Sequence, residues 1–287
     1  MDAGGAGVGR RLLTSALVLC LLAGPASLMA QPAYHVAVSP EYLPIELWQR
    51  FNPLILYLEA AIRARFELLV PRSVEELIDL VKKREVAFSY QNPYVLVLTW
   101  EASVPLALTV GAHGATESRS VIIVRKNSGI IRLNQLKGGR VSVGSLYSAG
   151  GFIEPRILMS GQGVDVERDM TVVVAKGNKQ ETVLHDVLDG QAEAGFVDEE
   201  VLNRVESKGV LSPGQLQELT ILAHTPSYPN WIFSAVNTVP DNMKKRMTEA
   251  LLKVSHHKAV VDAARIQGFV PVPDTYLENY RKRMAGR

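Results

Sequence analysis

The feature that most constrains this chain is a repeated alternation of short apolar strands with amphipathic helices. In the first third, the pattern predicts strands at residues 34–39, 66–70 and 86–90. Apolar residues at helical spacing fill the two intervals, at 45–62 and 74–83. Because parallel strands need crossover connections, this β-α-β-α-β order predicts a parallel sheet with helices on its faces.

Two local signals refine these helices. Pro53 lies inside the first helix, where proline lacks an N–H group and clashes with the preceding turn, so we expect a kink or a break. Ser73 and Glu76 have the spacing of a capping box, in which each side chain satisfies a free backbone N–H group. The second helix is therefore expected to begin directly after Ser73.

The alternation starts again in the middle of the chain. Strands are expected at 120–126, 140–144, 171–175 and 194–197, with helical segments at 131–136, 152–159 and 180–188. The last third predicts strands at 219–224 and 231–236, a helix capped by Asp241 that runs to about residue 264, and a closing helix at 276–284. These strands are too few for a third sheet, so we expect the last third to return to the first unit.

The predicted fold class is therefore α/β, with two lobes that are each a mixed, mostly parallel sheet flanked by helices. Two crossovers are expected, near residues 111–120 and 222–230. One lobe would comprise residues 31–117 plus 226–287, and the other residues 118–225. The length of 287 residues and the apolar fraction of 47% are sufficient for one large or two medium domains.

The first 30 residues have the layout of a secretory signal peptide. Arg10 and Arg11 precede an apolar run at 12–22, and small residues follow it. The run is about half of the ~20 residues that a membrane-spanning helix needs. We expect cleavage after Ala30, with a site near Ala26 as the alternative, and export to the periplasm. The arginine pair also permits twin-arginine export.

Cysteine usage and charge exclude several function classes. Cys20 is the only cysteine, so the exported chain has no disulfide and no thiolate for catalysis or metal binding. A rival interpretation makes Cys20 a lipid-anchored residue.

The net charge of +2 becomes +1 without the signal peptide, because Asp2 and the two arginines are removed. This balance argues against nucleic-acid or membrane-surface binding.

Three polar loops are expected at the carboxyl ends of strands, where ligands bind in open α/β sheets. The first follows residues 86–90, the second leads into the helix at 152–159, and the third lies at the first crossover. The candidate ligand-binding residues are Tyr90, Gln91 and Asn92 in the first loop, and Tyr147, Ser148, Gly150 and Gly151 in the second. In the third loop, at the crossover, they are Ser118, Arg119 and Ser120. The glycines allow close backbone approach, a helix N-terminus favours an anion, and Arg119 suits a two-pronged pair with an oxyanion.

Each loop also has a purely structural interpretation. The segment at Asn92 is consistent with an ordinary turn, Ser148 with a helix N-cap, and Arg119 with a solvated side chain.

The rival hypothesis from another function class is an enzyme, a secreted hydrolase or transferase. The sequence contains no nucleophile elbow, phosphate loop or zinc-helix motif, and His256 and His257 are adjacent on a predicted helix, where they diverge by about 100°. We therefore expect no enzyme, no metal and no cofactor.

Several segments together resemble the periplasmic phosphate, phosphite and phosphonate-binding proteins of ABC transporters, the PhnD-like family, which has the type II periplasmic binding protein fold. These segments are VAFSYQNPY at 86–94, SVIIVRKNSGI at 120–130, LNQLKGG at 133–139, SAGGFIEP at 148–155, VLDG at 187–190 and AGFVD at 194–198. The likeness covers residues 36–269. It implies two lobes that close on a ligand and deliver it to a membrane permease.

The resemblance also implies roles for single residues. Tyr90 matches a tyrosine that contacts the ligand, Ser120 a hydroxyl after the crossover, Ser148 the first serine of a Ser-Thr-Ser-Gly loop, and Asp198 an acidic position that accepts hydrogens from the ligand or its amine. The departures from the family pattern are Ala149 and Gly150 in place of two hydroxyls, Gln180 where many members have histidine, and Arg119 where many have tyrosine.

The leading hypothesis is thus a monomeric periplasmic protein that captures a small oxyanion, resembling phosphate, phosphite or phosphonate, for an ABC permease. The alternative partner is a sensor kinase in the inner membrane.

Overall fold

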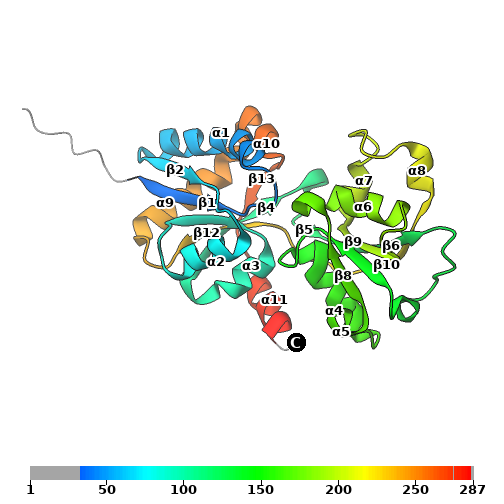
Figure 1. The fold of residues 1–287 in the computed structure, drawn as a ribbon. Coiled ribbons are helices and arrows are strands. Elements are labelled where there is room, and N and C mark those ends of the chain that lie inside the picture. Colours follow the sequence, from blue (N-terminus) through cyan, green and yellow to red (C-terminus); the bar gives the residue numbers. More distant parts are fainter. Residues whose placement is uncertain (1–32, 274, 286–287) are drawn as a thin grey trace, which may run out of the picture. The chain divides into compact units, whose positions relative to one another are not determined.

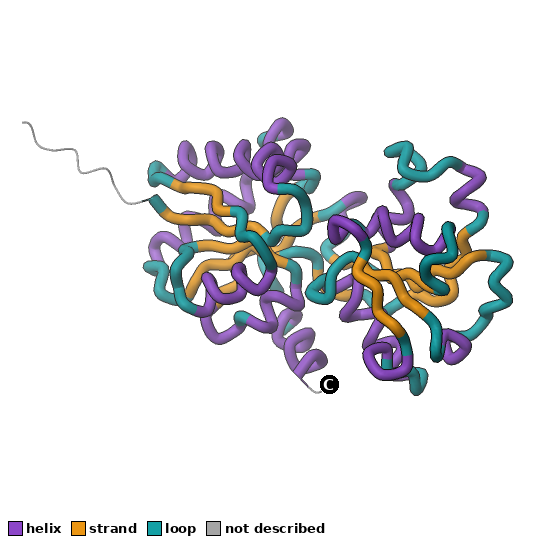
Figure 2. The backbone as a smooth tube through the Cα atoms, viewed as in Figure 1, coloured by secondary structure: helices purple, strands orange, loops and turns teal. Residues whose placement is uncertain are grey.

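The computed structural model describes residues 33–273 and 275–285. The predicted signal peptide, at residues 1–30, lies outside the described residues. The described chain forms two mixed β-sheets with helices on their faces, and a small ribbon of two short strands, β5 (Glu117–Ser118) and β11 (Tyr228–Pro229) (Figures 1 and 2). The α/β class expected from the sequence is confirmed.

The first sheet has six strands in the order β13-β4-β12-β3-β1-β2. Their bounds are β1 Tyr34–Val38, β2 Phe66–Leu69, β3 Phe88–Gln91, β4 Ser103–Val110, β12 Ile232–Val236 and β13 Gly268–Val270. β1 pairs in parallel with β2 and β3, as expected, whereas β12 and β13 run antiparallel to their neighbours. β12 lies between β3 and β4, so a strand from the last third completes a sheet that begins at residue 34.

Helices cover both faces of this sheet, and their bounds are α1 Pro44–Ile62, α2 Val74–Lys82, α3 Pro93–Leu98, α9 Asp241–Lys253 and α10 Lys258–Ala264. Residues of α1, α9 and α10 share one apolar cluster with Phe88 and Phe233 of the sheet, and residues of α2 and α3 pack with Ala37 in another. Ser73 Oγ accepts a bond from Glu76 N at 3.2 Å and caps α2, as expected, whereas the Glu76 carboxylate accepts from Arg72 N rather than from Ser73 N.

The break considered at Pro53 and the long helix expected from residue 241 need correction. α1 continues through Pro53 without ending; the carbonyl that the proline leaves unpaired belongs to exposed Gln49, where water can satisfy it. The long helix expected from residue 241 is broken by a 3-10 turn at Val254–His256 between α9 and α10. Asp241 is not its cap, because Pro240 occupies that position and Asp241 pairs with Lys244 at 2.8 Å.

The second sheet has five strands in the order β10-β6-β9-β7-β8. Their bounds are β6 Ser120–Arg125, β7 Arg140–Val143, β8 Thr171–Val174, β9 Ala194–Asp198 and β10 Leu219–His224. β7 pairs in parallel with β8 and β9, whereas β6 is antiparallel to β9 and β10. Both sheets are thus mixed rather than mostly parallel, because β6 and β12 enter them from the crossovers in the reverse direction.

The helices of the second sheet are α4 Glu154–Gly161, α5 Val166–Asp169, α6 Gln180–Leu188, α7 Glu199–Arg204 and α8 Pro213–Gln217. A π-helical turn at Ala149–Ile153 precedes α4, so the helix expected at 152–159 begins earlier and with a wider first turn. Phe152 and Met159 pack on one face of the sheet with Phe196, and Val183 and Val187 pack on the other face with Ile123.

The last helix, α11 (Tyr276–Ala285), belongs to two apolar clusters. Leu277 packs with Leu96 and Leu108 beside the first sheet, whereas Tyr280 and Met284 pack with residues of the second sheet. Within the part of the chain that the structure describes, no helix is both long and apolar enough to cross a membrane.

Candidate ligand-binding site

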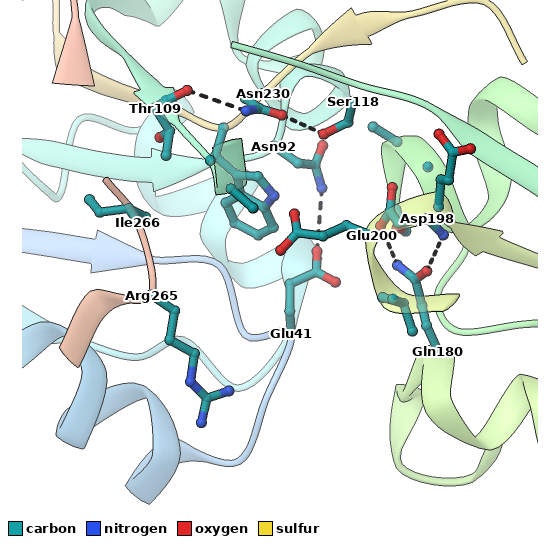
Figure 3. A pocket seen from close by; sticks show the side chains of 18 of the residues that line it. Glu41, Asn92, Thr109, Ser118, Gln180, Asp198, Glu200, Asn230, Arg265 and Ile266 are labelled. Carbon is teal, nitrogen blue, oxygen red and sulfur yellow. Dashed lines mark hydrogen bonds between the residues drawn. The ribbon is translucent and has the colours of Figure 1, made fainter. Parts of the chain in front are cut away.

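A cavity of about 580 Å³ lies where the carboxyl ends of β1, β3 and β9 meet the π-turn before α4 (Figure 3). Its lining includes Glu41, Tyr90 and Asn92 from the first sheet and its loops, and Ser148 and Asp198 from the second. This is the position that ligands take in open α/β sheets. Two of the three loops singled out from the sequence, after β3 and before α4, therefore face each other across one space.

Aromatic rings form the floor on the side of the first sheet. Tyr90 stacks on Trp231 with ring centroids 5.2 Å apart and contacts Phe51 at 5.1 Å. Thr109 Oγ1 donates to the Tyr90 hydroxyl at 3.2 Å. Burial raises the pKa of Tyr90 to about 12, so its hydroxyl keeps its proton and can donate to a ligand.

Glu41 is the carboxylate on the same side. It follows β1, and its Oε1 accepts a bond from Asn92 Nδ2 at 3.3 Å. The same Nδ2 group donates to the carbonyl of Tyr147 at 3.1 Å, and Asn92 Oδ1 caps α3 by accepting from Tyr94 N and Val95 N. Burial raises the pKa of Glu41 to about 7, and the nearby charge of Asp198 acts in the same direction.

A closed hydrogen-bond network forms the side of the second sheet. Gln180 Nε2 donates to Asp198 Oδ2 at 2.6 Å, and Gln180 Oε1 accepts from Asp198 N at 2.6 Å. The Tyr228 hydroxyl donates to Asp198 Oδ1 and lies 2.8 Å from Ser120 Oγ. Burial raises the pKa of Asp198. Both carboxylate oxygens of Asp198 thus already accept a hydrogen bond from the protein.

The π-turn is fitted closely against this network. Ser148 Oγ accepts from Gly151 N at 3.0 Å, so Ser148 is the N-cap, the interpretation left open by the sequence. A Cβ atom on Gly150 would lie 1.8 Å from Asp198 Oδ1 and 2.1 Å from the Tyr228 hydroxyl. Only glycine fits at Gly150, because the backbone there touches the acidic side chain directly.

Arg119 and Ser118 line the cavity but already have protein partners. The Arg119 guanidinium is bidentate to Glu199, with Nε to Oε2 at 3.1 Å and Nη2 to Oε1 at 3.3 Å, and half of the Arg119 side chain is exposed. Ser118 Oγ donates to Asn230 Oδ1, and Asn230 Nδ2 donates to the carbonyls of Thr109 and Ala115.

The structure brings eight of the twelve candidate residues to the cavity wall, namely Tyr90, Asn92, Ser118, Arg119, Ser148, Gly150, Gln180 and Asp198. The other four are not part of the wall. Gln91 is fully buried and its Nε2 lies 3.4 Å from Thr99 Oγ1, Ser120 sits behind Tyr228, Gly151 lies beneath Ser148, and Tyr147 contributes its carbonyl to Asn92. Whether any of the twelve contacts a ligand stays a prediction.

Sequence reasoning missed several polar residues of the wall, among them Glu41, Thr109, Tyr228 and Asn230. Glu41 had a usable signal, because it follows the first predicted strand at the same sheet edge as Tyr90. Tyr228 and Asn230 lie at the second crossover, whose two-residue strand is too short to show a pattern. Among residues 33–273 and 275–285, no group of three or more histidine, cysteine and acidic residues could hold a metal ion.

The comparison with protein families decides the relationship. A family model described as ABC transporter, phosphonate, periplasmic substrate-binding protein matches residues 36–277. The chain belongs to this family. The resemblance drawn from the sequence segments is thereby confirmed, and the family is a substrate-binding component of transporters in the periplasm.

Solved structures of low sequence identity share the fold of this phosphonate-family chain. XAC2383 from Xanthomonas citri bound to ATP has a TM-score of 0.77 at 16% identity and covers 88% of this chain and 97% of its own. PhnD1 from Prochlorococcus marinus in complex with methylphosphonate has a TM-score of 0.73 at 17% identity, with coverage of 88% and 98%.

A curated relative is the tetrathionate sensor histidine kinase TtrS of Salmonella typhimurium, which is 25% identical over 195 residues, or 63% of this chain. The chain spans about one third of that relative's length, because the match covers 33% of it.

Proposed function

We propose that this protein captures a small phosphonate-type oxyanion in the cavity between its two sheets and delivers it to an ABC permease. The predicted lobes, residues 31–117 plus 226–287 and residues 118–225, close around the ligand, and the permease recognises the closed form. The observation that carries the proposal is the cavity itself, whose wall is shared by polar groups of both sheets.

The wall supplies the donors that an oxyanion needs. The Tyr90 hydroxyl holds its proton, and the Ser39 hydroxyl lines the same space without a hydrogen-bond partner among the described residues. The first amide groups of a helix lack an intrahelical carbonyl, and since Ser148 caps only Gly151, those of Ala149 and Gly150 remain for a ligand.

The protein does no chemistry on what it binds. The wall carboxylates Asp198, Glu199 and Glu200 are bonded to neutral side chains or paired with arginines, which is not the nucleophile and base arrangement of a hydrolase. Binding and release by a monomer are therefore the whole of the proposed activity.

A thermal-shift and calorimetry panel tests this function. The mature protein is titrated with methylphosphonate, phosphate, phosphite and sulfate, and a ligand of the folded state raises Tm by mass action. We expect a Tm increase of several degrees at ligand concentrations about 100-fold above Kd, with no turnover of the ligand by phosphorus NMR. The absence of any shift across the panel would refute the oxyanion proposal.

A second candidate rests on the relative named above. In that case the cavity belongs to a ligand-sensing subunit, and the partner is a sensor kinase of the inner membrane. Adding tetrathionate to the same panel separates the two proposals. A shift with tetrathionate and none with methylphosphonate would favour the sensor.

A further inference from the structure

Glu41 is a carboxylate of the cavity whose side-chain hydrogen bond within the described chain reaches only one of its two oxygens, Oε1. The Asn92 amide, a neutral donor, reaches Glu41 Oε1 at 3.3 Å. Among the described residues, no lysine, arginine or histidine forms an ion pair with it. Figure 3 shows its carboxylate turned toward the middle of the cavity, and the carboxylate of Glu200 is directed to the same space.

Arg265 and Lys179 also line the cavity, but neither forms an ion pair with Glu41. Asp198 faces it from β9 and repels it. Glu200 is paired with Arg204 at 3.1 Å, so that arginine is already occupied. Arg50 donates to the Ala264 carbonyl at 3.1 Å and lies over the Tyr42 ring.

Asp198 is differently placed, since both of its oxygens accept bonds within the protein. It is therefore a positioning residue for the π-turn. Glu41 Oε2 has no such bond from the described part of the protein, so this carboxylate is available to meet a ligand.

Two hydrogen-bond acceptors can bond to each other only if one of them carries a proton. An ionised carboxylate and a fully ionised oxyanion are both acceptors, and their like charges repel. Because no cation among the described residues is paired with Glu41, its contact with the oxyanion needs one hydrogen between the two oxygens, as in a carboxyl pair that shares a proton.

We propose that Glu41 and the bound oxyanion share a single proton, which makes Glu41 the specificity-determining residue of the cavity. The proton lies either on Glu41, which then donates to the ligand, or on the ligand, which then donates to Glu41. No other bond forms or breaks. The cavity thus selects oxyanions that hold a proton near neutral pH, and it rejects those that stay fully ionised when Glu41 is ionised. This inference rests on the proposed function.

Calorimetric titration with methylphosphonate, between about pH 6 and pH 9, tests the proposal. For the wild type we expect affinity to fall by up to about tenfold per pH unit above pH 7, because the shared proton is lost. In Glu41→Gln the amide donates without a titrating proton, so the fall in affinity per pH unit should be shallower than in the wild type. Glu249→Gln, an exposed charge removal on α9, should keep the wild-type profile.

Sulfate, which has no proton to share in this range, gives the specificity arm. At about pH 8 the wild type should bind sulfate at least tenfold more weakly than methylphosphonate, and Glu41→Gln should narrow that gap. Equal pH profiles of wild type and Glu41→Gln, with methylphosphonate bound, would overturn the inference alone. An affinity that rises through pH 7 would also overturn it, since it would mean that Glu41 binds a cation.

A measurement on the wild type keeps the test valid if Glu41→Gln does not fold. Titrations at about pH 8 in two buffers of different ionisation enthalpy report protons taken up on binding. We expect uptake approaching one proton, and uptake near zero would overturn the inference. No methylphosphonate binding at any pH would remove the proposed function, and the inference with it.

Discussion

The two sides of the cavity use acidic residues in opposite ways. On the side of the second sheet, Asp198 is bonded to Gln180 and Tyr228. On the side of the first sheet, the neutral amide of Asn92 donates to one oxygen of Glu41. Burial raises the pKa of both carboxyls, yet only the second-sheet network is complete without a ligand.

The difference separates a group that builds the wall from a group that is available to a ligand. A completed polar network is rigid, since each member fixes the geometry of the next. A carboxylate with neutral donors and no cation is instead unfavourable in its ionised form and gains from a proton donor. Family position pointed to Asp198 as the ligand contact, whereas the hydrogen bonds favour Glu41.

The largest effect is expected from Gly150→Ala. The new Cβ would lie 1.8 Å from Asp198 Oδ1, so the network must break or the π-turn must move. We expect a loss of ~3 kcal/mol in the free energy of unfolding, measured with urea. The control is Gly161→Ala in α4, where nothing lies within 4 Å of the added atom. Equal stability of the two variants would show that the second-sheet wall is not tightly built.

Tyr228→Phe removes one donor from the same network. The hydroxyl bonds both Asp198 Oδ1 and Ser120 Oγ, so its loss leaves two buried groups short of a partner. We expect ~2 kcal/mol of destabilisation in urea unfolding. Tyr34→Phe, on β1, is the matched control and should change stability by less than ~0.5 kcal/mol. A similar small change for Tyr228→Phe would mean that water replaces the hydroxyl.

The pH dependence of stability tests the Glu41 side. Its pKa is raised from 4.5 to about 7, so the folded state binds its proton more tightly than the unfolded state. The free energy of unfolding should therefore fall as pH rises from about 4.5 to about 7. Because Glu41 is partly exposed to the cavity, we expect only ~1–2 kcal/mol over this range. Glu41→Gln should remove this part of the slope; an unchanged slope would place its origin at Asp198.

The smallest effect is expected from Arg119→Gln. Arg119 is half exposed and paired with Glu199, so the pair contributes less than ~1 kcal/mol. Affinity for methylphosphonate should change by less than about threefold in calorimetry, because Glu199 already neutralises the guanidinium. A loss of tenfold or more would show that Arg119 leaves Glu199 when the ligand binds.

The sequence predicted the α/β class and most of the strands, because buried strands and amphipathic helices leave strong periodic patterns. It missed β4, which is an inner strand of the first sheet. Pro105 argues against an inner strand, since proline cannot donate to the ladder. The structure accommodates it at an irregularity, where the pairing with β12 shifts register next to Ser234. An inner strand tolerates Pro105 because of this irregular pairing with β12, which the sequence of β4 alone does not show.

The site was predictable only in part, for a related reason. The loops at Tyr90 and Ser148 were found because strand ends converge at one sheet edge. The sequence could not show that Gln91 points to Thr99, or that Gln180 and Tyr228 occupy both oxygens of Asp198. Which polar groups satisfy one another depends on contacts between segments far apart in the chain, such as Gly150 against Asp198.

The place of β12 between β3 and β4 has a consequence for the order of folding. The second sheet is built from residues 120–224 alone, whereas the first sheet has a gap at its centre until residue 236 is in place. The second sheet can therefore assemble from a contiguous stretch with short loop closures, while β3 and β4 wait with unpaired edges for a strand more than a hundred residues away. That interval is when the chain is most exposed to aggregation, and it is when a chaperone would protect it most.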